Sequence, residues 1–142
     1  MDANTARRWL QRLMLALGVL CLSAIGAAIM PHDWLAGAVK QFEPQTPVYV
    51  VVEFLARFLS LFYVLLGALL VVFGRDIRRY ATSIRIIAWW CVLGMGVFAW
   101  FALPRVVSGQ TGGLLFVLIA ADALVGNACA VAILVLLRRA LR

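Results

Sequence analysis

Four long apolar runs, separated by short polar segments, dominate the sequence. Each run has about the 20 residues that an α-helix needs to cross a hydrocarbon core roughly 30 Å thick. The pattern therefore predicts four transmembrane helices, over residues 13–30, 48–73, 86–103 and 114–137.

The segments between the runs predict where the helices end. Pro31 follows the first run, and Pro104 is expected to stop the third, because proline cannot donate a backbone hydrogen bond. Residues 43–47 hold two prolines and predict a linker, whereas residues 105–113 are rich in glycine and predict an outer loop. The basic segment 74–85 predicts the turn between the second and third helices.

A short amphipathic helix is expected on the outer membrane surface, over residues 31–42. Its apolar positions follow a helical period, and most of its polar residues fall elsewhere on the helix. The apolar positions are Trp34, Leu35, Ala38, Val39 and Phe42.

Composition agrees with a chain that is mostly surrounded by lipid. Residues of the AVILMFWYC class make up 65% of the 142 positions, and the mean hydropathy is +1.03, far above a soluble domain. We therefore expect one all-α domain over residues 1–142, an antiparallel bundle of four transmembrane helices.

The basic residues are placed unevenly along the chain. If all four runs span the membrane, ten of the 13 basic residues lie on one side, which the positive-inside rule makes the cytoplasmic side. Both termini are then cytoplasmic, and the net charge of +7 reflects topology and anionic lipids rather than nucleic acid. A cleaved signal peptide is the alternative for the first run, since Arg7-Arg8 precedes it; we favour a retained helix because the run has about 17 residues.

Four charges lie away from the cytoplasmic boundary: Glu53, Arg57, Arg105 and Asp122. Glu53 and Arg57 are four residues apart and can form an ion pair on one helix. A bare carboxylate at the depth of Asp122 costs about 2.5–3.5 kcal/mol, so we expect it to pair with Arg57 or Arg105, to be hydrated or to be protonated. Small residues share its helix face, and the neighbouring Asn127 is placed to supply a hydrogen bond between helices.

Two interpretations of this charged cluster remain open. It is either a set of salt bridges that fixes the register of the helices, or an outward-facing pocket for a polar or anionic head group, or for a proton. His32 is the only histidine and is interpreted as a solvated residue, with a titrating His32-Asp33 pair as the alternative.

Motifs for catalysis and for cofactors are absent from the sequence. It holds no Ser-His-Asp set, P-loop, dinucleotide fingerprint or HExxH, and its three cysteines lie singly inside apolar runs. A single histidine excludes a haem held by two histidines within one chain. We expect no enzymatic activity, no cofactor and no metal site.

The order of the spans resembles a group of bacterial proteins. The chain resembles the small four-helix DoxX-like proteins and neighbouring families. The resemblance rests on four short spans with a surface helix after the first, on Arg57 early in the second span and Gly74-Arg75 at its end, and on Asp122 in the fourth. The resemblance implies a bacterial inner-membrane protein, in some cases associated with quinone or redox complexes.

The expected function is therefore non-enzymatic. We expect an accessory or assembly subunit of a membrane complex, or a binder of a lipid or quinone-like ligand at the charged cluster. The alternative is a small dimeric transporter or channel that uses the intramembrane charges. Expected partners are membrane lipids, other membrane subunits or a second copy of the chain.

Overall fold

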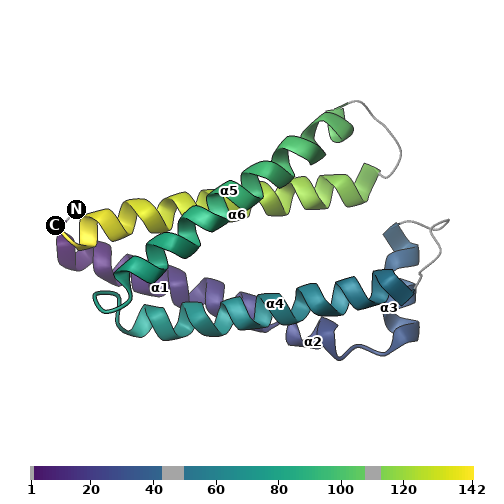
Figure 1. Cartoon of the computed structure of the whole chain (residues 1–142), viewed down its shortest axis with the longest axis horizontal. Coiled ribbons are helices and arrows are strands. Elements are labelled where there is room, and N and C mark those ends of the chain that lie inside the picture. The colour runs from purple at the N-terminus through teal and green to yellow at the C-terminus, as the bar shows by residue number, and fades with distance from the viewer. Residues whose placement is uncertain (1, 43–49, 108–112) are drawn as a thin grey trace. The chain divides into compact units, whose positions relative to one another are not determined.

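The protein is all-helical throughout the part of the chain that the structure, a computed structural model, describes: residues 2–42, 50–107 and 113–142 (Figure 1). The helices are α1 (Ala3–Leu22), α2 (Ile25–Ala28), α3 (His32–Phe42), α4 (Val50–Arg75), α5 (Ala81–Val107) and α6 (Gly113–Ala140).

The prediction of a membrane protein with four spanning helices is supported by helix length and composition. Four stretches are long and apolar enough to cross a membrane: Ala3–Ala28, Glu53–Arg75, Ala81–Phe101 and Ile119–Ala140. The expected short helix is present as α3, which begins one residue after Pro31, and its place on the outer membrane surface stays a prediction. The predicted linker at residues 43–47 lies outside the described residues.

Several helix boundaries differ from the prediction. The predicted turn over residues 74–85 is shorter, because α5 begins at Ala81 and residues 81–85 are helical. The first helix begins at Ala3, well before residue 13, because the arginine-rich segment consists largely of good helix formers. It is interrupted at Ser23 and Ala24, where Ser23 Oγ donates to the Leu20 carbonyl over 2.6 Å and the backbone tightens to i→i+3 hydrogen bonds.

The expected stop at Pro104 is wrong, since α5 continues to Val107 with the proline inside it. Proline removes one helical hydrogen bond, whereas ending the helix earlier in apolar surroundings leaves several backbone groups unpaired, which costs more. Residues 105–107 are consequently helical and not part of a loop, and Gly113 begins α6.

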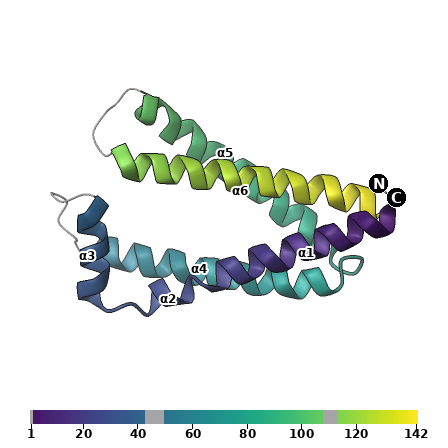
Figure 2. The same cartoon turned by 180° about the vertical axis from the view of Figure 1, so that it is seen from behind.

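Two compact units divide the chain: residues 14–74 form one, and residues 1–13 with 75–142 form the other. In the first unit, α1 and α4 run antiparallel (Figures 1 and 2) and approach closely at Gly18 and Gly67. A Cβ on Gly67 would lie 2.7 Å from the Gly18 carbonyl oxygen and 2.9 Å from the Leu22 amide nitrogen. Only glycine permits this contact between backbones, the device that membrane helices use to pack.

In the second unit, α5 and α6 pack against each other as an antiparallel pair (Figure 2). The small face of α6 lies on the packed side: Ala123 and Ala130 are buried, and a Cβ on Gly126 would be in ordinary contact with Met95, at 3.5 Å from its Cγ. Larger residues on this face would hold the two helices apart.

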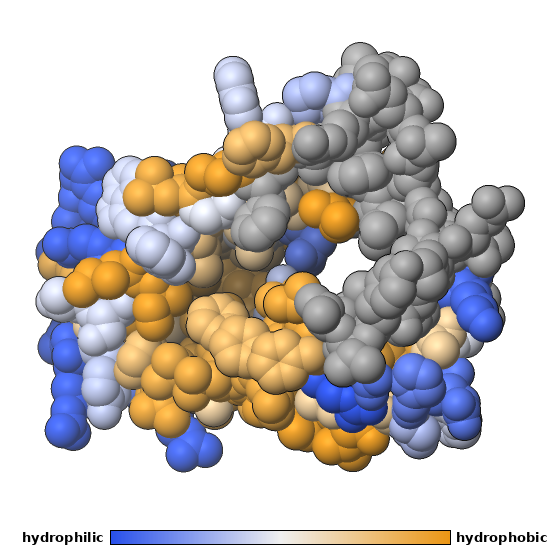
Figure 3. All heavy atoms as spheres, turned by 45° about the vertical axis from the view of Figure 1, so that its right-hand side comes forward, coloured by the Kyte–Doolittle hydropathy of each residue, from blue (hydrophilic) through white to orange (hydrophobic). Residues whose placement is uncertain are grey.

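Apolar side chains cover the outside of both helix pairs. Several phenylalanines and leucines of α4 and the tryptophans of α5 are more than half exposed, and no polar or charged residue in the described part of the chain is fully buried. Figure 3 shows hydrophobic side chains along the middle of the helices and hydrophilic side chains toward their two ends. Such an exterior is stable in lipid and not in water.

Candidate functional site

The charged residues of α4 form the ion pair that their spacing predicts. Arg57 Nη2 donates to Glu53 Oε1 over 2.7 Å, and Arg57 Nε donates to the same oxygen over 3.1 Å. The pair lies in the first turns of the span that begins at Glu53. Two hydrogen bonds from one guanidinium fix its plane relative to the carboxylate.

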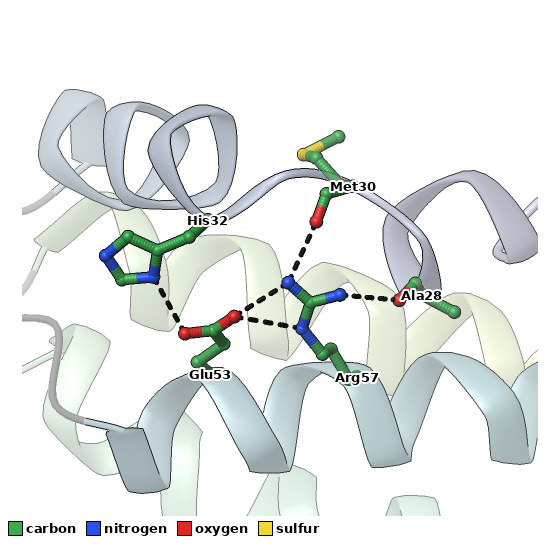
Figure 4. Close-up of polar contacts among 5 residues, drawn as sticks. All are labelled: Ala28, Met30, His32, Glu53 and Arg57. Atoms are coloured by element: carbon green, nitrogen blue, oxygen red, sulfur yellow. Dashed lines mark hydrogen bonds and ion pairs between the residues drawn. The ribbon is translucent and has the colours of Figure 1, made fainter.

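Arg57 also binds the backbone that follows the first span (Figure 4). Its Nη1 donates to the Ala28 carbonyl oxygen over 3.0 Å, and its Nη2 donates to the Met30 carbonyl oxygen over 2.9 Å. Ala28 is the last residue of α2, and the nitrogen of Pro31 has no hydrogen to donate. A helix end leaves its last carbonyls without helical partners, and a basic side chain is one group that can satisfy them.

His32 completes this group from the first turn of α3. Its Nδ1 lies 2.7 Å from Glu53 Oε2, so the two carboxylate oxygens of Glu53 bind different residues. The histidine side chain is 57% exposed, as expected for a solvated residue, and its unpredicted contact with Glu53 joins α3 to α4. We call His32, Glu53, Arg57 and the carbonyls of Ala28 and Met30 the α4 network.

The α4 network satisfies its own charged groups. Arg57 donates four hydrogen bonds, all to groups of this chain, and its net charge is balanced by Glu53. Its side chain is 33% exposed and that of Glu53 is 21% exposed. Because several kcal/mol separate a satisfied backbone carbonyl from an unsatisfied one in lipid, this geometry stabilises the connection between α2, α3 and α4.

The remaining predicted site residues belong to the other compact unit. Asp122 is exposed on α6, one turn into the span that begins at Ile119. Asn127 is half-buried and faces α5, where its Nδ2 is 4.0 Å from the position a Cβ on Gly96 would occupy. Arg105 lies in the last turn of α5. The predicted meeting of Asp122 with Arg57 or Arg105 stays a prediction.

Metal ligands do not gather in the described residues: no three His, Cys, Asp or Glu side chains are placed to hold an ion. The three cysteines form no disulfide with one another. The geometry of the α4 network is that of ion pairing and capping, without an activated nucleophile.

Sequence reasoning missed two parts of the network: the contact of His32 with Glu53, and the carbonyls of Ala28 and Met30. A signal for the carbonyls was present, since Pro31 near the end of the first helix cannot donate to them, and the nearest intramembrane donor in the next span is Arg57. No family model, curated protein or solved structure matches the chain.

Proposed function

We propose that the chain is a non-enzymatic protein of the bacterial inner membrane that acts as an accessory or assembly subunit of a larger membrane complex. In this proposal the four spans fold as one antiparallel bundle with both termini in the cytoplasm, as in the DoxX-like proteins that the sequence resembles. Ten basic residues on one side of the spans favour that orientation.

The observation that carries the proposal is the closed α4 network. A pocket for an anionic head group needs a donor that the protein leaves available, but the Arg57 guanidinium already binds Glu53 and two carbonyls. This favours the structural interpretation for the Glu53 and Arg57 half of the charged cluster. The side chains that remain available for function are then those exposed on the outside of the helices.

The outside of α5 offers large apolar side chains to a partner protein. On α5, Trp90, Leu93, Val97 and Trp100 are each more than half exposed, at spacings that place them along the helix toward one side. Aromatic residues are enriched where proteins associate, and a subunit of a membrane complex presents such side chains to neighbouring helices.

Co-purification tests the proposal. The tagged chain is extracted with its surrounding lipid in a polymer that forms nanodiscs, and the recovered proteins are quantified by mass spectrometry. We expect a defined partner protein in fixed ratio, reduced by Trp90→Ala with Trp100→Ala but not by the matched change Phe58→Ala on α4. Recovery of the chain without a protein partner and with a stoichiometric small molecule would overturn the proposal.

Asp122 favours a second candidate, a small transporter or a binder of a lipid or quinone-like ligand. Its carboxylate is exposed within a span, and exposed carboxylates at that depth often serve binding or ion transfer. For this candidate Asp122→Asn should give a folded protein that has lost its ligand or transport. Loss of folding in the same variant would assign Asp122 to structure.

A further inference from the structure

Ten arginines lie at the helix ends of one compact unit, residues 1–13 with 75–142. They come from three segments. The first is the beginning of α1, the second runs from the last residue of α4 to the beginning of α5, and the third is the end of α6 with the residues after it. Figures 1 and 2 show these three segments at the same end of the helices, where both termini lie. We call them the arginine end: Arg7, Arg8, Arg12, Arg75, Arg78, Arg79, Arg85, Arg138, Arg139 and Arg142.

The arginine end has almost no negative charge of its own. Its three segments contain only two carboxylate side chains, Asp2 and Asp76, and within the described residues none of the ten arginines forms an ion pair. All but Arg7 are exposed. Positive charge of this density is left for an external anion.

The choice of arginine over lysine indicates which anion. The sequence has 13 basic residues, and its one lysine, Lys40, lies elsewhere, in α3. A guanidinium presents a planar fork that binds phosphate oxygens through two parallel hydrogen bonds, whereas an ammonium acts as a point charge. Topology alone is served by either residue, so phosphate binding adds a reason for arginine.

The backbone beneath these side chains is held by a buried core. Leu10, Ile77 and Leu137, one from each segment, are 0%, 2% and 1% exposed. Ile77 directly precedes Arg78 and Arg79, and Leu137 directly precedes Arg138. Arginines next to fixed core residues lose less conformational freedom on binding than arginines on a loose tail.

Aromatic side chains place the arginine end at the level of lipid head groups. The Arg12 guanidinium lies 5.8 Å from the ring centre of Trp9, and Arg79 lies 5.5 Å from that of Tyr80. Trp9 is 55% exposed, and tryptophan and tyrosine concentrate at the boundary between lipid and water. The anion nearest to these arginines is therefore a lipid phosphate.

We propose that the arginine end binds a phospholipid whose head group carries two phosphates, with the phosphates held by arginines from different segments. Such a lipid matches a site built from three helix ends better than a lipid with one phosphate. This inference goes beyond the proposed function and does not depend on it, because no partner subunit is needed for the binding.

The affinity of the chain for different lipids tests the proposal. The chain is reconstituted in phosphatidylcholine nanodiscs that contain either cardiolipin, with two phosphates, or phosphatidylglycerol, with one, at equal total phosphate, and native mass spectrometry gives the apparent affinity. We expect cardiolipin to bind at least about tenfold more tightly than phosphatidylglycerol. Equal affinities for the two lipids would overturn the two-phosphate site. Soluble pyrophosphate that binds as tightly as cardiolipin would show that the phosphates need not belong to a lipid.

Variants locate the binding at these residues. Arg78→Gln with Arg138→Gln removes one exposed arginine from each of two segments and should weaken cardiolipin binding about tenfold or more. Lys40→Gln removes an exposed positive charge from α3 and should leave the affinity unchanged. Unchanged melting of the double variant in pure phosphatidylcholine shows that it folds, and full cardiolipin affinity in that folded variant would contradict the proposal.

Discussion

Arg57 and the arginine end carry the same side chain in opposite circumstances. Arg57 lies within a span, and its guanidinium binds one carboxylate and two backbone carbonyls. The arginines at the helix ends, all but Arg7, are exposed, and within the described residues they have no ion-pair partner. Depth explains the difference, because a charge in apolar surroundings must find partners in the protein, whereas a charge at the interface finds them in water and lipid.

This difference separates two roles for positive charge. Partners inside the chain make Arg57 a residue of the fold, and its removal should be felt in stability. Exposure makes the arginine end a surface for binding, and its removal should be felt in affinity. Stability measurements on single substitutions can therefore distinguish the two roles.

The largest loss of stability is expected for Arg57→Gln. The substitution leaves Glu53 without its ion-pair partner and two carbonyls without donors, which we expect to cost about 3 kcal/mol of unfolding free energy. The double variant Glu53→Gln with Arg57→Gln should recover part of this loss, because no lone charge remains. Unfolding by sodium dodecyl sulfate in mixed micelles measures both, and a loss below about 0.5 kcal/mol for Arg57→Gln would show that the network contributes little.

Gly67→Ala should follow, at about 2 kcal/mol. The new Cβ would meet the Gly18 carbonyl oxygen at 2.7 Å, so α1 and α4 must move apart. Gly94→Ala on α5 is the matched control, because nothing lies within 4 Å of its added Cβ, and it should be neutral or slightly stabilising. Equal effects of the two changes in the same unfolding assay would argue against a close crossing at Gly67.

His32→Gln is expected to have a smaller effect, about 0.5–1 kcal/mol. The histidine contributes one contact to Glu53 and is more than half exposed, so water can replace part of what is lost. Lys40→Gln, another exposed substitution on α3, serves as the control and should change stability less. A loss from His32→Gln as large as that from Arg57→Gln would mean that Glu53 depends on His32 as much as on Arg57.

Hydrophobic length and helical periodicity were enough to predict four helices long and apolar enough to span a membrane, and the short helix α3. Their consequences are local, since about 20 apolar residues suffice to cross a bilayer wherever they occur. The i,i+4 pair of Glu53 and Arg57 was predictable for the same reason.

Apart from the contact of His32 with Glu53, the interactions that sequence reasoning missed involve the backbone. Ala28 and Met30 bind Arg57 through carbonyl oxygens, which every residue has, so the only signal in the sequence was the nearby Pro31. The passage of α5 through Pro104 likewise depends on the cost of ending a helix in lipid, which weighs against the local preference of proline. The close contact of Gly18 with Gly67 joins two glycines far apart in the sequence.

The most direct test of the role of Arg57 is solid-state NMR in bilayers, with ¹⁵N in the arginine guanidinium groups and ¹³C in the carbonyls of Ala28 and Met30. Dipolar recoupling measures whether Arg57 nitrogens lie beside these carbonyls or beside lipid ³¹P, and subtraction of the Arg57→Gln spectrum assigns the signal. We predict strong coupling of Arg57 to both carbonyls and none to ³¹P, as hydrogen bonds of 3.0 and 2.9 Å require. Coupling of Arg57 to ³¹P without coupling to the carbonyls would contradict the structural role and make Arg57 a head-group ligand.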